Sequence, residues 1–192
     1  LYLSKRGEYP VAYWNKILQD WSEIDDPKVH NTLLRRLGML PKGVLVEISH
    51  ALSSWFDKFL VTMLNDNEEA LWFAFDEFID AIWQSEEDVA KSSIVDTTRG
   101  GRSLNLSRRT YGHAINSPAG KITESLFKQL KAMNLERGDG IPDFIKSRFP
   151  KLTTLGGEGQ DYAVVIFSKF TEWMMWLDAD WTVKNTIPWF SF

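Results

Sequence analysis

The fold of this chain is decided by residues 44–83, which read VLVEISHALSSWFDKFLVTMLNDNEEALWFAFDEFIDAIW. Apolar side chains recur every three or four positions in both halves of this stretch, a period typical of amphipathic α-helices. The polar run Asn65-Asp66-Asn67 separates the halves, and Glu68-Glu69 suits the first turn of a second helix. We therefore predict one helix over about residues 41–64 and another over 68–83, joined as an antiparallel αα-hairpin.

Prolines mark the other expected helix starts, because proline lacks the N–H that a first turn leaves unpaired and its φ already suits a helix. The prolines placed in this way are Pro10, Pro27, Pro41, Pro118 and Pro142. Further helices are predicted over residues 10–21, 27–38, 118–133, 142–149 and 160–177, and Gly156, Gly157 and Gly159 form a flexible entry to the last. No strand pair is predicted. The expected class is all-α, with stacked antiparallel amphipathic helices in an irregular helical repeat or a bundle.

The helical pattern fails between residues 91 and 113, where the composition turns to Ser, Thr, Gly and Arg. Five basic residues stand against Asp96 alone in this stretch, so a basic insert interrupts an acidic protein. We predict an irregular loop over residues 91–107, with order returning near Tyr111. The chain then divides into N-terminal helical hairpins (1–90), a basic insert (91–115) and a C-terminal helical part (116–192), all within one continuous domain.

Composition restricts the function classes. Hydrophobic residues make up 44% of the 192 residues and aromatic residues 14%, which is enough for a packed core. A net charge of −4 argues against a globally basic nucleic-acid binder, and the absence of cysteine excludes disulfides, thiolate metal sites and cysteine nucleophiles. No apolar run reaches the roughly eighteen residues of a membrane span. The start lacks Met and the end is apolar, so we expect a segment of a larger cytoplasmic protein.

Residues suited to catalysis or metal binding are scattered. His30, His50 and His113 each stand alone, outside any metal-ligand spacing. Asp76 and Asp80 share a helix face, which we interpret as a solvated acidic face rather than a carboxylate pair for catalysis. We assign no catalytic residue, metal or cofactor, and loop flexibility explains the glycines at 156–159 better than anion binding does. An enzyme that uses His113 with a nearby carboxylate is kept as an alternative.

The arginines of the insert allow two interpretations. Guanidinium groups bind phosphates in two-pronged fashion, so a nucleic-acid or nucleotide site is one alternative function. A solvated linker has the same composition and is favoured. The residues concerned are Arg99, Arg102, Arg108 and Arg109.

A motif follows the insert, at residues 109–124, which read RTYGHAINSPAGKITE. Asn116 or Ser117 is expected to cap the helix that Pro118 opens. Ala119 and Gly120 would let another backbone approach closely. The buried face of this helix would come from Ile122, Leu126 and Phe127.

This motif resembles an Asn-x-Pro-Ala-Gly-x-x-x-Glu pattern of large bacterial anti-phage defence proteins, in the C-terminal helical regions of those that begin with a sirtuin-like NAD-cleaving domain. The stretch 176–182 is similar to the same regions, so the resemblance covers residues 109–192. It implies a non-catalytic sensor or scaffold that recognises a protein partner, either a phage component or the protein's own effector domain, and regulates that effector. Any NAD chemistry would lie outside these residues, and an oligomer is compatible with this role. The motif residues are Asn116, Ser117, Pro118, Ala119, Gly120 and Glu124.

Overall fold

The computed structural model describes residues 9–24, 26–85, 92–94, 98–99, 102–103 and 110–190, without the side chains of 64–67, 98–99 and 102–103. Helices dominate this part of the chain. The helices are α1 (Val11–Trp21), α2 (Pro27–Leu37), α3 (Lys42–Glu47), α4 (Ser49–Trp83), α5 (Tyr111–Ile115), α6 (Pro118–Ala132), α7 (Asp143–Lys146), α8 (Phe149–Thr153), α9 (Gly157–Leu177), α10 (Ala179–Asn185) and the 3₁₀ helix η2 (Ile187–Phe190).

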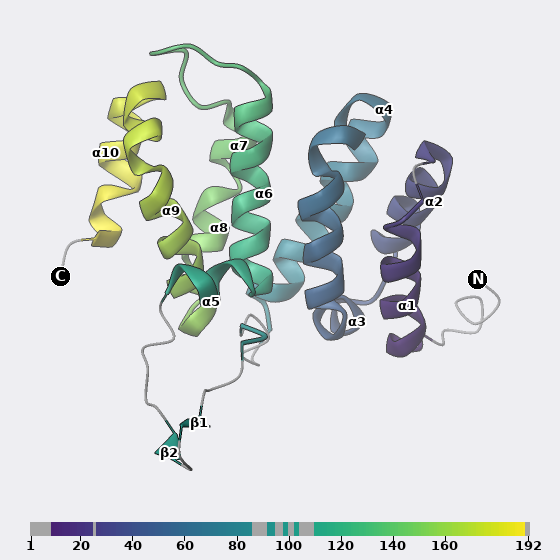
Figure 1. Ribbon diagram of the computed structural model, residues 1–192. Helices are drawn as coiled ribbons and strands as arrows, with labels where there is room; N and C mark the ends of the chain where they lie inside the picture. Colours follow the sequence, from purple (N-terminus) through teal and green to yellow (C-terminus); the bar gives the residue numbers. More distant parts are fainter. Residues whose placement is uncertain are drawn as a thin grey trace.

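The helices stand side by side in a stack that runs from α1 and α2 at one end to α10 at the other (Figure 1). Helices α1, α2 and α3 pack on α4, and α4 packs on α6 and α8. Helix α9 then packs on α5, α6 and α8, and α10 packs on α9. The predicted class, all-α with stacked amphipathic helices, is confirmed.

Helix α4 folds back on itself. Its helical assignment runs without interruption from Ser49 to Trp83, yet the ring centroids of Phe56 and Phe75 lie 5.1 Å apart. A straight helix would separate these two positions by about 28 Å along its axis. The midpoint between them falls at residues 65–66, so the chain reverses at Asn65-Asp66-Asn67. The antiparallel pairing predicted for residues 41–83 is therefore present, although the helical assignment carries on through the reversal; we name residues 49–63 the first arm and residues 68–83 the second arm.

Two predicted helices are each broken in two. The helix expected from residue 41 bends at Ile48, whose ψ of 10° separates α3 from α4. This bend leaves Leu45, Ile48 and Leu52 all within the core. The helix predicted over residues 142–149 is interrupted between α7 and α8 by Pro150, because a proline ring clashes with the carbonyl four residues earlier, here that of Lys146, the last residue of α7.

The glycines at 156–159 begin a helix rather than form a flexible entry to one. Helix α9 starts at Gly157, earlier than the predicted residue 160. Gly156 has a φ of 80° and Gly157 a φ of 53°, in the left-handed region that side-chain-bearing residues rarely adopt. Glycine is required here because the chain turns sharply from α8 into α9.

The prediction of no strand pair is wrong. Strands β1 (Thr98–Arg99) and β2 (Arg102–Ser103) pair antiparallel, with Arg99 opposite Arg102. The two intervening residues in the sequence are Gly100 and Gly101, and a two-residue Gly-Gly spacing is a known hairpin signal. Most of the predicted irregular loop over 91–107 lies outside the described residues. Regular structure resumes at α5, close to Tyr111 as predicted.

Aromatic side chains that contact one another contribute to the core along the stack. Phe56 contacts Phe75 and Phe78 within α4, and Phe127 of α6 contacts Phe149, Phe167 and Phe170. The predicted buried face of α6 is confirmed, because Ile122, Leu126 and Phe127 are fully buried. No helix in the described ranges is long and apolar enough to span a membrane.

Candidate functional site

The motif at 109–124 joins α5 to α6 through Ser117. The Ser117 hydroxyl accepts a hydrogen bond from the Gly120 N–H (3.0 Å) and donates one to the Ala114 carbonyl (2.8 Å). Pro118 occupies the first turn of α6, as predicted. Asn116, the other candidate cap, closes α5 instead, and its side-chain amide donates to the Gly112 carbonyl at 2.8 Å.

Gly120 lets α5 and α6 approach each other closely. A Cβ atom added at this position would lie 2.0 Å from the Ala114 carbonyl oxygen, far inside van der Waals contact. Only glycine fits, which confirms the close backbone approach predicted from the motif. Ala119, the preceding small residue, is fully buried. These motif residues act in packing within the chain.

Glu124, the last motif residue, belongs to a polar cluster with Tyr111 and Lys169. The Tyr111 hydroxyl donates to Glu124 Oε1 at 3.2 Å and accepts a hydrogen bond from Lys169 Nζ, which also lies 3.6 Å from Glu124 Oε1. The hydrogen bond with Tyr111 raises the pKa of Lys169. The Lys169 ammonium lies 4.4 Å from the centre of the Tyr111 ring. The Lys169 ammonium therefore connects α5, α6 and α9.

Helix α6 is also bound to the first arm of α4. Lys121 Nζ donates to Ser54 Oγ at 2.7 Å, and Lys128 Nζ pairs with Asp57 Oδ1 at 2.6 Å. Burial lowers the pKa of Lys121, and the nearby Asp57 carboxylate opposes that shift. The motif helix is therefore fixed on two sides, against α9 and against α4.

The histidines do not gather into a site. The His113 Nδ1 hydrogen-bonds to the Thr110 hydroxyl at 2.7 Å, a contact within the first turn of α5. His30 is buried against the rings of Phe59 and Trp55, with centroids 4.2 and 5.8 Å away. His50 is exposed on α4. In the part of the chain that the structure describes, no group of three His, Asp or Glu side chains is arranged to hold a metal ion.

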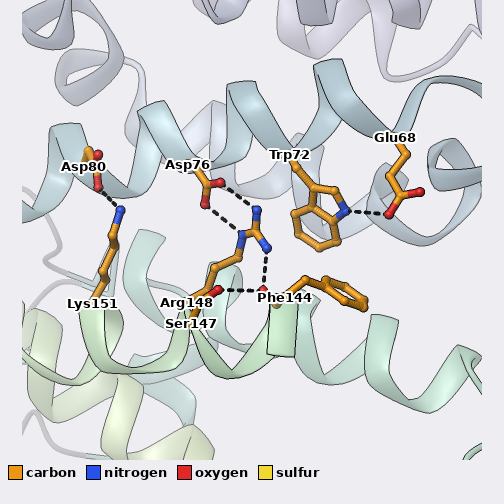
Figure 2. A network of polar contacts seen from close by, with 8 residues as sticks. All are labelled: Glu68, Trp72, Asp76, Asp80, Phe144, Ser147, Arg148 and Lys151. Carbon is orange, nitrogen blue, oxygen red and sulfur yellow. Dashed lines mark hydrogen bonds and ion pairs between the residues drawn. The ribbon is translucent and has the colours of Figure 1, made fainter. Parts of the chain in front are cut away.

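Arg148, the residue just before α8, forms an ion pair with the second arm of α4 (Figure 2). Arg148 Nε and Nη2 donate to the two oxygens of Asp76 at 2.8 and 2.6 Å, and Nη1 donates to the Phe144 carbonyl at 2.5 Å. The guanidinium carbon also lies 4.1 Å from the centre of the Trp72 ring. The Arg148 side chain is 10% exposed. Such two-pronged pairing fixes the distance and orientation of the two elements.

The same helix face carries further polar contacts, at every fourth residue. Glu68 Oε1 accepts a hydrogen bond from Trp72 Nε1 (3.3 Å), and Asp80 Oδ1 pairs with Lys151 Nζ at 2.5 Å (Figure 2). The interpretation of Asp76 and Asp80 as a solvated acidic face is wrong, because both carboxylates pair with cations across a helix interface. Trp72 lies among the acidic residues on this face of the helix, and this was the sequence signal that another helix covers the face.

Asp178 performs a similar role at the other end of the chain. It caps α10 through the Trp181 N–H (3.2 Å), accepts from the Ile141 N–H (3.2 Å) and pairs with Lys146 Nζ at 2.7 Å. Burial opposes ionisation of Asp178, but the hydrogen bonds from Lys146, Ile141 and Trp181 outweigh it and lower the pKa of this carboxyl. The carboxylate fixes the start of α10 against α7.

One exposed apolar patch lies where α2 ends against the second arm of α4. Met39 is 71% exposed and Phe73 is 55% exposed. The Phe73 ring rests on the backbone of Gly38, since a Cβ added there would lie 2.7 Å from two ring carbons. Leu37 and Leu40, on either side, are buried and hold this turn in place. We name Met39 and Phe73 the apolar knob.

Sequence reasoning missed this knob, although Phe73 lies outside the apolar stripe of its helix, at helical spacing with Asp76 and Glu77. Phosphate or nucleic-acid binding by the arginines of the insert remains a prediction. The backbones of Arg99 and Arg102 pair in the β1–β2 hairpin, but the structure does not describe their side chains. Arg108 and Arg109 lie outside the described residues.

Comparison with protein-family models, with curated proteins and with solved structures finds no match to this chain.

Proposed function

We propose that this chain is a non-catalytic helical scaffold that binds a protein partner through the apolar knob, Met39 and Phe73. In the anti-phage defence protein implied by the motif at residues 109–124, the partner is a phage structural protein or the effector domain of the same protein. That effector would carry the chemistry, with NAD as its substrate.

The observation that carries the proposal is the exposure of two large side chains on a rigid support. Phe73 stands outward from a helix whose neighbouring residues Trp72, Ala74 and Phe75 are buried, so its position is fixed by the core. Aromatic side chains held in this way lose little entropy when a partner covers them, and they are typical centres of protein interfaces. Exposed Arg35 and Arg36, in the last turn of α2, place positive charge close by along the chain. The fitting partner has an apolar pocket with an acidic rim.

The proposal is tested by retention of purified phage capsid and tail proteins, and of the isolated effector domain, on the immobilised chain. We expect one of these proteins to be retained by the wild-type chain and lost with Phe73→Ser. The matched control is Ile24→Ser, which removes an exposed apolar side chain elsewhere and should leave binding unchanged.

Two results would reject the proposal. One is binding that Phe73→Ser and Met39→Ser leave intact. The other is that none of these proteins is retained by a wild-type chain whose helical circular-dichroism spectrum shows it to be folded.

A further inference from the structure

Helix α6 carries three lysines in different surroundings. Lys121 ends its first turn, Lys128 lies about two turns later, and Lys131 belongs to its last turn. Lys128 Nζ pairs with Asp57 Oδ1 at 2.6 Å. The Lys131 ammonium lies 4.7 Å from the centre of the Phe170 ring. A carboxylate or an aromatic face therefore stabilises the charged form of both these lysines.

The Lys121 ammonium is held by a neutral group instead. Its Nζ donates to Ser54 Oγ at 2.7 Å, and within the described ranges it forms no ion pair with a carboxylate. Burial lowers the pKa of Lys121, and the charge of Asp57 opposes this shift only in part. The Asp57 carboxylate is already paired with Lys128. The surroundings of Lys121 therefore favour the neutral amine more than those of Lys128 do.

The position of Lys121 within α6 acts in the same direction. The first turn of a helix carries the positive end of the helix dipole, where a cation is disfavoured, and the last turn carries the negative end, where a cation is stabilised. None of residues 118–121 is acidic, so no side chain of that turn offsets the dipole. The helix dipole therefore disfavours the charged form of Lys121 and favours that of Lys131.

The Lys121 amine can be reached from solvent. Its partner Ser54 is exposed on the first arm of α4, and Lys121 itself is half-buried. A neutral amine has the free electron pair that attacks a carbonyl carbon, and lysines partly withdrawn from water are those that proteins use as nucleophiles. The site therefore combines the reactive form of the amine with access from solvent.

We propose that Lys121 is a preferred acylation site, with an acyl phosphate as the donor, because a small donor suits an amine at the contact of two packed helices. The electron pair of Nζ forms a bond to the acyl carbon, and the bond from that carbon to the phosphate oxygen breaks. The phosphate leaves with the electrons of that bond, and the nitrogen loses one proton to water. The product is a neutral amide, so no oxidant or reductant takes part.

Acylation weakens the contact of α6 with the first arm of α4. An ammonium has a charge and three N–H donors, whereas the amide has no charge and a single donor. The acyl group also adds volume beside Ser54, where the two helices pack. The modification therefore controls how firmly the motif helix is held, independently of the apolar knob.

The test is incubation of the folded 192-residue chain with acetyl phosphate, with mass spectrometry of the acetylation of each lysine over time. We expect Lys121 to react several-fold faster than Lys128, the control on the same helix. Lys169, whose pKa is raised by its hydrogen bond with Tyr111, should react slowest of the three. In urea at a concentration that unfolds the chain, the three rates should become similar, because the differences arise from the fold.

Acetylation of Lys121 no faster than that of Lys128 in the folded chain would overturn the proposal. A preference for Lys121 that persists in urea would also overturn it, since it would then come from the local sequence. The weakened contact is measured by urea denaturation after the same treatment. The wild type should unfold at a lower urea concentration than before, and Lys121→Arg, which keeps the charge and resists acetylation, should change less. Equal changes in the two chains would contradict the structural effect assigned to Lys121.

Discussion

The guanidinium of Arg148 and the carboxylate of Asp76 form a two-pronged ion pair between residues 72 positions apart in the chain. The pair joins the start of α8 to the second arm of α4. The Trp72 ring covers one face of the guanidinium. Removal of Asp76 from such a pair costs more than the pair contributes, because the charge of Arg148 then remains largely buried and unmatched.

Asp76→Ala is therefore expected to lower the free energy of unfolding by about 2 kcal/mol, discounted for the partial exposure of Asp76. Urea denaturation measures the change. The control is Asp80→Ala, whose pair with Lys151 is more exposed and should contribute less than about 1 kcal/mol. Equal losses in the two variants would contradict the structural role given to Arg148.

Gly120 supports a second prediction, with a matched glycine elsewhere. Gly120→Ala is expected to destabilise the protein by about 3 kcal/mol or prevent folding, because its Cβ would meet the Ala114 carbonyl. Gly43→Ala, in α3, meets nothing within 4 Å and should stabilise by roughly 0.5 to 1 kcal/mol, since alanine favours the helix. Thermal unfolding of both variants measures these two changes in stability. A Gly120→Ala variant as stable as the wild type would rule out the close contact between α5 and α6.

The lowered pKa of Asp178 predicts an acid-dependent contribution to stability. Because the folded pKa lies below the ordinary value of 3.8, the contribution is complete above that pH and is lost as pH falls through the folded pKa. The stability difference between the wild type and Asp178→Asn should therefore be largest near neutral pH and shrink on acidification below 3.8. Urea midpoints at several pH values measure it. A difference that does not change with pH would refute ionic stabilisation by Lys146.

For His30 we predict a substitution that keeps or raises the stability of the protein. Among the residues that the structure describes, neither ring nitrogen finds a hydrogen-bond partner, and the ring is packed against Phe59 and Trp55. Replacing an unsatisfied buried polar group by an apolar one of similar shape is neutral or stabilising. His30→Phe should keep or raise the melting temperature, whereas His30→Ala should lower it through a cavity. A marked loss of stability in His30→Phe would show that the imidazole nitrogens have polar partners in solution.

Local features of this protein were predictable from sequence, and long-range ones were not. The serine cap and the close approach at Gly120 follow from four adjacent residues, because capping and glycine packing are local effects. The reversal near Asn65 follows from one polar run between two apolar patterns. The pairing of Asp76 with Arg148 depends on how α7 and α8 lie on α4, and no spacing in the sequence reports that arrangement.

Two predicted helix boundaries were wrong, for different reasons. Pro150 was a visible signal, and its ring clash with Lys146 explains the break between α7 and α8. The bend at Ile48 has no breaking residue, and the shared burial of Leu45 and Ile48 is a tertiary effect. Phe73 could have been separated from the core stripe by sequence, because adjacent helix positions point about 100° apart and Phe73 falls on the side of Asp76. The packing of its ring on Gly38 is a long-range contact that no spacing in the sequence reports.

The proposed partner recognition through the apolar knob is tested most directly in the full-length defence protein that the proposal implies. The measurement is phage plating efficiency on cells that produce the wild type, Phe73→Ser with Met39→Ser, or the control Ile24→Ser, at matched protein levels. We predict that the wild type and the control restrict the phage and that the double variant does not. Restriction by the double variant at the level of the wild type, or by a protein lacking residues 1–192, would contradict the assignment of partner binding to this surface.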